Sequence, residues 1–234
     1  MKVILLAGGM GTRLQSVVSN IPKPMAPSGD VPFLDILLKN LIDQGIDEVT
    51  LSVGYRHEVI MEYFGNSFQG VPINYIVEET PLGTGGALRK ALQGNSEGTP
   101  YFVLNADTFI DVNLTEMLNG YLASGADVGI VLKQLDDVSR YGRVTLDSKH
   151  TEIISFEEKS GCETGFVNMG VYIIRPDFFD RFVLPNAFSL EKDCFVAMLS
   201  NISFFPWLSE GYFIDIGVPE DYERAQFEME SFCR

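Results

Sequence analysis

The sequence predicts an α/β fold in which a mostly parallel sheet carries helices on both faces. Residues 3–7 form a continuous apolar run, which is typical of a parallel strand buried on both sides. In residues 34–42 the apolar side chains recur at i, i+3, i+4, i+7 and i+8, which is one face of a helix. Strand-like and helix-like patterns then alternate, and repeated β–α units produce a parallel sheet with right-handed crossovers.

The first half of the chain contains the expected parallel strands, separated by helices. Gly45 and Gly65 follow the first two helical patterns, and glycine commonly ends a helix. Residues 113–116 resemble a capping box, which opens a further helix. We expect strands at residues 3–7, 49–53, 73–77 and 101–104, and helices at 34–42, 58–64, 87–92 and from 113 onwards.

The second half is richer in β-structure. Pro219 suits the first position of a C-terminal helix, because its fixed φ matches the helix and its missing N–H is not needed there. The acids of this helix, Glu220, Asp221, Glu223, Glu228 and Glu230, are expected to form a solvated face. We expect strands at residues 128–132, 143–146, 153–156, 171–174 and 212–214, and helices at 177–182, 190–199 and from 219 onwards.

Composition and charge exclude several classes of protein. The formal net charge of -15 argues against binding to nucleic acids or anionic membranes, which depends on basic patches. No apolar run approaches the ~20 residues of a membrane span, and the first residues lack the layout of a signal peptide. The three cysteines form no CxxC pair, so neither a disulfide framework nor a zinc site is indicated. We therefore expect a cytoplasmic protein that binds neither nucleic acid nor membrane.

A glycine-rich turn follows the first strand, in a segment that is unusually basic for this chain. Residues 1–29 contain no acid but include Lys2, Arg13 and Lys23. Glycines let backbone N–H groups approach a phosphate closely, and an arginine adds a forked donor. Leu14 stands where a dinucleotide-binding turn needs glycine, and no Gly-Lys-Ser/Thr follows as in a Walker A loop. We therefore expect the turn to bind phosphate in a way that differs from both schemes. A purely structural turn stays open as the alternative.

Two further loops, around Lys23 and at residues 78–87, contain candidate functional residues. Pro22 and Pro24 restrict the backbone around Lys23, although a braced loop with a chance lysine is the alternative. Residues 78–87 turn at a proline and lead into a helix near Thr84, whose first backbone N–H groups are expected to be exposed donors. A structural turn is again the alternative.

Asp107 and Asp215 each follow an apolar run. A lone acid at a strand end is often a turn or helix cap. Two such acids that converge would suit Mg2+, because this ion takes few carboxylates and completes its shell with phosphates and water.

The run Gly8-Gly9-Met10-Gly11-Thr12-Arg13, followed by Pro22-Lys23-Pro24, resembles the signature of the sugar-1-phosphate nucleotidyltransferases. The resemblance implies a Rossmann-like three-layer sandwich with a mostly parallel mixed central sheet, of the nucleotide-diphospho-sugar transferase type. It implies a single domain over residues 1–234, with a nucleotide-binding half at about 1–125 and a sugar-binding half at about 126–234. The implied reaction joins a nucleoside monophosphate to a sugar 1-phosphate with Mg2+ and releases pyrophosphate. Whether the chain forms a homo-oligomer stays open.

The resemblance also assigns roles to individual residues. Arg13 would contact the triphosphate and the departing pyrophosphate, and Lys23 would lie beside the α-phosphate. The loop 78–87 would flank the nucleobase, in a form more similar to guanylyltransferases than to thymidylyl enzymes. Asp107 and Asp215 would hold Mg2+. The catalytic residues would be Arg13, Lys23, Asp107 and Lys159, and the nucleotide-binding residues Leu6, Ala7, Gly8, Gly9, Gly11, Thr12, Arg13, Lys23, Glu78, Gly83, Thr84 and Asn105.

On the sugar side, Glu158 and Lys159 match the family's Glu-Lys pair. By resemblance Glu158 would hold sugar hydroxyls and Lys159 the sugar phosphate, with Asn168 and Gly170 lining the sugar pocket. An exposed charge pair is the alternative for the first two, because such pairs are common. The family usually has glycine where Ala106 stands; if that position needs a positive φ, alanine would cost energy there.

Longer runs at residues 16–27, 140–142, 188–193 and 212–222 look similar to bacterial D-glycero-α-D-manno-heptose 1-phosphate guanylyltransferases. This resemblance implies GTP and that heptose 1-phosphate as substrates, for surface polysaccharide synthesis. A mannose 1-phosphate guanylyltransferase, a muramate-type sugar 1-phosphate uridylyltransferase and a non-catalytic nucleotide-sugar-binding regulatory homologue stay open. A metal-dependent glycosyltransferase is disfavoured, because residues 105–107 supply only one acid of an Asp-x-Asp pair.

Overall fold

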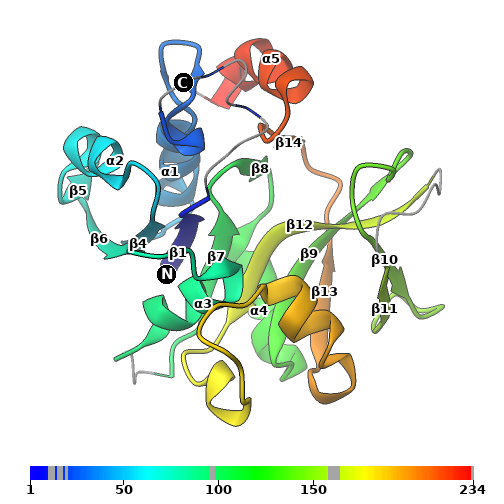
Figure 1. Ribbon diagram of the computed structural model, residues 1–234. Coiled ribbons are helices and arrows are strands. Elements are labelled where there is room, and N and C mark those ends of the chain that lie inside the picture. The colour runs from blue at the N-terminus through cyan, green and yellow to red at the C-terminus, as the bar shows by residue number, and fades with distance from the viewer. Residues whose placement is uncertain (10–13, 15–17, 19–20, 95–97, 158–163, 233–234) are drawn as a thin grey trace.

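The computed structural model describes the chain except residues 10–13, 15–17, 19–20, 95–97, 158–163 and 233–234. The helices are α1 Phe33–Asp43, α2 His57–Phe64, α3 Gly83–Leu92, α4 Leu114–Ser124 and α5 Pro219–Glu228 (Figure 1). The strands are β1 Lys2–Ala7, β2 Pro27–Ser28, β3 Val31–Pro32, β4 Glu48–Val53, β5 Ser67–Phe68, β6 Val71–Val77, β7 Tyr101–Asn105, β8 Thr108–Ile110, β9 Val128–Leu135, β10 Arg143–Leu146, β11 Ile153–Glu157, β12 Gly165–Ile174, β13 Phe204–Leu208 and β14 Phe213–Asp215.

Ten of the described strands form one large central sheet that is parallel in its first half, and β8–β14 and β2–β3 form two short pairs. Strand β1 lies between β4 and β7 and is parallel to both, and β6 extends the parallel part beyond β4. Strand β12 is antiparallel to β7 and carries the second half of the sheet, with β9 and β13 on one branch and β10 and β11 on the other. The prediction of a mostly parallel mixed sheet with flanking helices is confirmed.

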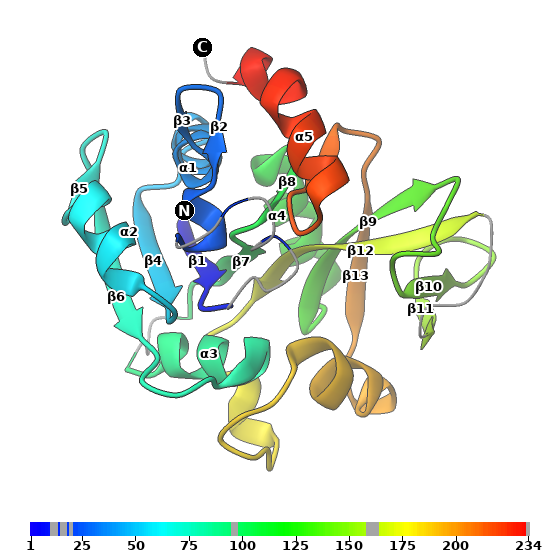
Figure 2. The ribbon, with the colours of Figure 1, turned by 45° about the horizontal axis from the view of Figure 1, so that its top comes forward.

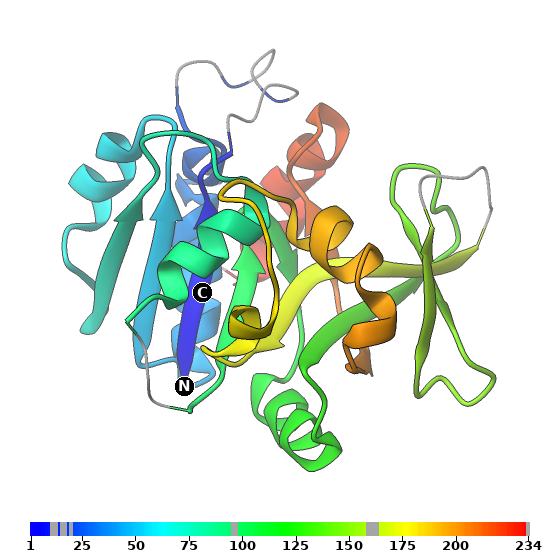
Figure 3. The same cartoon turned by 60° about the horizontal axis from the view of Figure 1, so that its bottom comes forward.

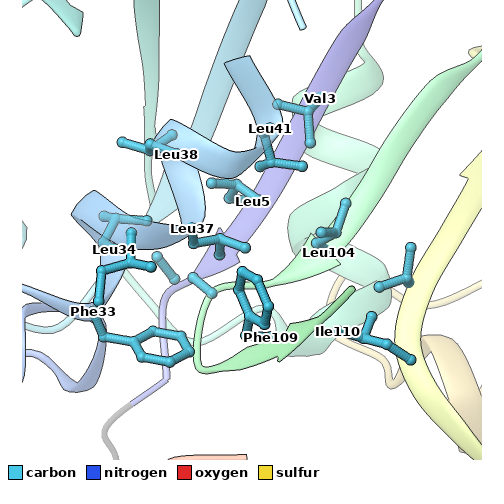
Figure 4. Packing of buried hydrophobic residues seen from close by; sticks show 14 of the residues in the cluster. Val3, Leu5, Phe33, Leu34, Leu37, Leu38, Leu41, Leu104, Phe109 and Ile110 are labelled. Atoms are coloured by element: carbon cyan, nitrogen blue, oxygen red, sulfur yellow. The ribbon is translucent and has the colours of Figure 1, made fainter. Parts of the chain in front are cut away.

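Two separate apolar cores lie on the two faces of the sheet. Val3 and Leu5 of β1 pack with α1 on one face, as the close view shows (Figure 4). Ile4 points to the opposite face, where it joins Leu88 of α3 and Phe195 in the second core. This alternation follows from the strand period of two residues. Helix α3 and residues 178–201 therefore cover the face opposite α1 and α5 (Figure 3).

Most of the expected elements are present, but three differ. Residues expected to form helices at 177–182 and 190–199 form a 3-10 turn, Phe178–Arg181, and a π-helical turn, Leu190–Val196, followed by a 3-10 turn, Leu199–Asn201. The expected strand at 171–174 is the end of the longer β12. Strand β13 was not expected. It contains Pro206, which lacks an N–H and is tolerated there because, among the described strands, β13 pairs with β9 alone.

The β10–β11 hairpin projects from the end of β12, away from α2 and β5 on the opposite side of the molecule (Figure 2). Helix α5 lies beside β14 and the β2–β3 hairpin, where the Ser28 hydroxyl donates to the Ala225 carbonyl over 3.2 Å. Among the described residues, no helix combines the length and apolarity that a membrane crossing requires.

Candidate active site

A cavity of about 370 Å3 opens at the carboxyl ends of β1 and β7, the edge of a parallel sheet where ligands commonly bind. Its wall brings together segments that are distant in the sequence: the turn after β1, the loop around Lys23, the loop before α3 and the end of β7. The lining residues are Leu6, Ala7, Gly8, Gly9, Lys23, Pro24, Glu78, Pro81, Gly83, Thr84, Ala87, Asn105 and Asp107.

These residues include each described residue that the sequence assigned to nucleotide binding. Gly11, Thr12 and Arg13 lie outside the described residues, as do Glu158 and Lys159. The pairing of β1 with β7 explains part of this arrangement, because it places Asn105 beside Leu6 in parallel register. The Ala106 N–H continues the ladder by donating to the Leu6 carbonyl over 3.1 Å.

The Glu78 carboxylate is held on the wall of the cavity by two donors. Oε1 accepts a hydrogen bond from the Ser52 hydroxyl (3.1 Å), and Oε2 accepts one from the Leu82 N–H (3.2 Å). The carboxylate lies so close to the first turn that a Cβ at Gly8 would stand 2.3 Å from Oε1. Glycine at residue 8 therefore leaves the space that the Glu78 carboxylate occupies. Each carboxylate oxygen keeps capacity for a further donor from a ligand.

The start of α3 differs from expectation. The first N–H groups of this helix were expected to be exposed donors, yet those of Gly85 and Gly86 both donate to the Phe188 carbonyl, over 3.0 and 3.3 Å. The Phe188 N–H donates in return to the Leu82 carbonyl (2.9 Å). That prediction is wrong for these two groups, because a segment one hundred residues later in the chain satisfies them.

Lys23 begins a 3-10 turn, Lys23–Met25, which Pro22 precedes and in which Pro24 is the second residue. Its side chain is only 12% exposed, and its Nζ is 2.8 Å from Oδ2 of Asp107. A Cβ at Gly217 would stand 3.3 Å from the same Nζ, so the loop after β14 also approaches this ammonium. The turn thus presents a half-enclosed positive charge to the cavity, at the end of β7.

Asp107 and Asp215 come together because β8 and β14 form a short antiparallel pair. Asp215 stands opposite Thr108 in this pair, and the Ile216 N–H donates to the Asp107 carbonyl over 3.0 Å. Oδ1 of Asp215 accepts a hydrogen bond from the Gly217 N–H (2.7 Å). Two neighbouring carboxylates beside a cavity fit Mg2+, whose remaining ligands are commonly phosphates and water. Among the described residues no larger cluster of metal-binding side chains occurs.

Ala106, which stands where the family usually has glycine, is fully buried between these residues. Its φ is not positive, since the described non-glycine residues with positive φ are Arg56, Gln69 and His150. Alanine therefore meets no backbone strain at this position.

Asn168 and Gly170, which the resemblance assigned to the sugar pocket, lie at an irregularity of β12, where its register with β9 shifts. Gly170 has a φ of +70°, and a Cβ there would stand 2.4 Å from Nδ2 of Asn105. Oδ1 of Asn168 accepts the Gly170 N–H over 2.9 Å. Neither residue is among the described residues that line the cavity, but Gly170 packs against Asn105, which does line it.

Sequence reasoning missed a cluster beside Asp215. Arg140 donates to Oδ2 of Asp221, and Arg224 donates to Oδ1 of the same carboxylate over 3.0 Å. Asp221 is only 6% exposed, so the prediction of a solvated acid is wrong for this residue. Burial and then the Asp215 charge raise the pKa of Tyr141 to about 12, which is consistent with the 140–141 loop lying near Asp215.

Comparisons with known proteins find relatives over nearly the whole chain. The family model described as nucleotidyl transferase matches residues 2–231. The D-glycero-alpha-D-manno-heptose 1-phosphate guanylyltransferase of Aneurinibacillus thermoaerophilus is 42% identical over 232 residues, which cover 99% of this chain and 100% of that protein. The crystal structure of HddC from Yersinia pseudotuberculosis complexed with GMP-PN has a TM-score of 0.85 and 34% identity, covering 98% of this chain and 99% of that one. The mannose-1-phosphate guanylyltransferase catalytic subunit beta of Dictyostelium discoideum is 32% identical but is covered over only 62% of its length.

Proposed function

The chain belongs to the nucleotidyl transferase family, and from this membership we propose that it transfers GMP from GTP to a sugar 1-phosphate. The observation that carries the proposal is the convergence of the glycine turn, Lys23 and Asp107 on one cavity, with Asp215 beside Asp107 through the β8–β14 pair. A phosphate oxygen of the sugar 1-phosphate attacks the α-phosphorus of GTP, the bond from that phosphorus to the bridging oxygen breaks, and pyrophosphate leaves.

This reaction brings together two anions, with charges of about -2 and -4, so the protein must lower their repulsion and align them. No general base is needed, because the attacking phosphate is already ionised at pH 7. Lys23 supplies a fixed positive charge at the cavity, held by Asp107. Asp107 and Asp215 would hold Mg2+, which would neutralise phosphate charge when bound. Arg13 and Lys159 remain proposed partners of the triphosphate and the sugar phosphate.

The choice of GTP is supported by the carboxylate of Glu78. A carboxylate only accepts hydrogen bonds, and guanine offers adjacent N1–H and N2–H donors on one edge. Uracil and thymine offer one N–H flanked by two carbonyl oxygens, which a carboxylate repels. Because Ser52 and Leu82 hold the Glu78 carboxylate in place, it is pre-oriented for the guanine edge.

For the sugar we propose D-glycero-α-D-manno-heptose 1-phosphate, giving GDP-heptose for surface polysaccharide synthesis. The support is the 42% identity over the whole length of a relative with that substrate in its name. Mannose 1-phosphate is the second candidate, favoured by the relative from Dictyostelium discoideum at 32% identity. A reaction that consumes GTP is consistent with the cytoplasmic location expected from the sequence.

The test is a pyrophosphate-release assay with Mg2+, each nucleoside triphosphate and a panel of sugar 1-phosphates, with the product identified by mass spectrometry. The expected result is release with GTP and the heptose 1-phosphate, and much slower release with mannose 1-phosphate. Release with UTP in preference to GTP would contradict the assignment of Glu78. No release with any pair, although GTP binds, would favour a regulatory homologue over an enzyme.

A further inference from the structure

Glu191 joins the two halves of the site, although it is not among the described residues that line the cavity. It lies in the π-helical turn Leu190–Val196, and its carboxylate accepts three hydrogen bonds from side-chain hydroxyls. Oε1 accepts from Oη of Tyr172 (2.9 Å), and Oε2 accepts from Oγ1 of Thr84 (3.0 Å) and from Oγ of Ser189 (3.1 Å). One carboxylate therefore connects α3 with β12.

The nucleotide-side arm ends at Thr84, in the first turn of α3 and on the wall of the cavity. Oγ1 of Thr84 accepts the Leu190 N–H over 2.9 Å, so its hydrogen is directed to Glu191. Helix α3 and the π-helical turn lie side by side on one face of the sheet (Figure 3). The rotamer of Thr84 is thus determined by the turn and not by the helix alone.

The sugar-side arm ends at Asn168. Oη of the fully buried Tyr172 donates its hydrogen to Glu191, so it must accept from Nδ2 of Asn168, at 2.8 Å. Oδ1 of Asn168 then faces the Gly170 N–H. Burial and then the Glu191 charge raise the pKa of Tyr172 well above its usual value, which keeps the phenol protonated as a donor.

We propose that Glu191 is a positioning residue that orients Thr84 on the nucleotide side and, through Tyr172, Asn168 on the sugar side. The proposal rests on the proposed function, since the two arms are named for its two substrates. A carboxylate is required because it only accepts hydrogen bonds, and all three of its neighbours donate. Glu191 lies in a π-helical turn, a kind of element often found at functional sites, and its hydrogen bonds direct the carboxylate toward α3 and β12.

The variant E191Q keeps the shape of the side chain but replaces one acceptor by an N–H2 donor. If that donor faces Tyr172, the phenol reverses and donates to Asn168. The Asn168 amide must then turn its own N–H2 toward the Gly170 N–H, and that hydrogen bond is lost. If the donor faces Thr84, the hydroxyl there loses its acceptor. One of the two arms is misoriented in either case.

The experiment compares E191Q with the control E116Q, the same chemical change at an exposed position of α4. E191Q should lower kcat/KM by about tenfold, the effect of one lost hydrogen bond to a charged group, whereas E116Q should leave it unchanged. Hydrogen exchange should become faster at the amide of Leu190 or at that of Gly170, according to which arm the new donor faces, and stay unchanged in β1. The second readout needs no activity.

A double-mutant cycle tests the connection itself. Thr84→Val and Tyr172→Phe each remove one hydroxyl, and their fold-losses in kcat/KM should be less than multiplicative together when Glu191 is present. In the E191Q background the same two losses should multiply. The proposal is overturned if E191Q behaves as E116Q, or if exchange becomes faster at neither Leu190 nor Gly170. Wild-type protein that releases no pyrophosphate would refute the proposed function, and the exchange result would still decide the role of Glu191.

Discussion

A substitution at Gly170 measures how closely β12 packs against Asn105 on the wall of the cavity. The change is Gly170→Ala. Its φ of +70° costs an L-residue about 1–2 kcal/mol. The new Cβ would stand 2.4 Å from Nδ2 and 3.0 Å from Cγ of Asn105, and overpacking of this kind adds about 1–3 kcal/mol. The free energy of unfolding should therefore fall by about 3 kcal/mol, with a decrease in Tm of roughly 6–12 °C.

Gly125→Ala is the matched control. Gly125 has a φ of +66°, but a Cβ there meets nothing within 4 Å, so only the backbone cost of about 1–2 kcal/mol applies. Thermal and urea unfolding of the two variants separate the packing cost from the backbone cost. Gly170→Ala should also lower kcat/KM, because it displaces Asn105 on the wall of the cavity. Equal destabilisation by the two variants would refute the close packing of Gly170 on Asn105.

Three other changes test single parts of the site. Lys23→Ala should slow the chemical step in single-turnover experiments by about 100-fold or more, since it removes a positive charge from the cavity; an unchanged rate would place Lys23 outside the site. Glu78→Gln should lower kcat/KM for GTP by about 10- to 100-fold while affecting UTP much less, and a retained preference for GTP would refute the guanine contact. Asp221→Asn should lower the free energy of unfolding by about 1–3 kcal/mol, because Arg140 and Arg224 share its buried carboxylate, whereas the exposed Glu220→Gln should have no effect in urea unfolding.

The sequence predicts the parts of the fold that depend on local pattern. The apolar run of β1 and the helical spacing of α1 identify both elements, because one face of each packs in the same core. Asp107 was expected at the sheet edge for the same reason, since it follows a buried strand. Strand β8, in contrast, has three residues, which is too short for a period to be recognised.

The parts that could not be predicted depend on contacts between distant segments. The free N–H donors expected at the start of α3 are used by Phe188, whose approach no local pattern reveals. In the sequence, Asp221 has the pattern of an exposed acid on a helix. Its burial depends on Arg140, from a loop 81 residues earlier, which no local pattern reveals. Glu191 lay within a run that resembled known guanylyltransferases, but its three donors come from separate elements. Only the three-dimensional arrangement identifies its partners.

The convergence of Asp107 and Asp215 depends both on local pattern and on a contact between distant segments. Each follows a short apolar run, and the resemblance assigned both to one metal ion. The β8–β14 pair that brings them together has only three residues on each side. Local pattern indicates the two acids, while the pairing of these short strands determines that they meet.

Pyrophosphate release by Asp107→Asn at saturating Mg2+, with GTP and the sugar 1-phosphate, tests most directly whether the two converging acids serve nucleotidyl transfer. Asp111→Asn is the matched control, the same change at an exposed position after β8. Asp107→Asn should lose at least about 100-fold in turnover while its unfolding temperature stays close to that of the control. Full turnover by Asp107→Asn would contradict a metal-assisted reaction at this cavity.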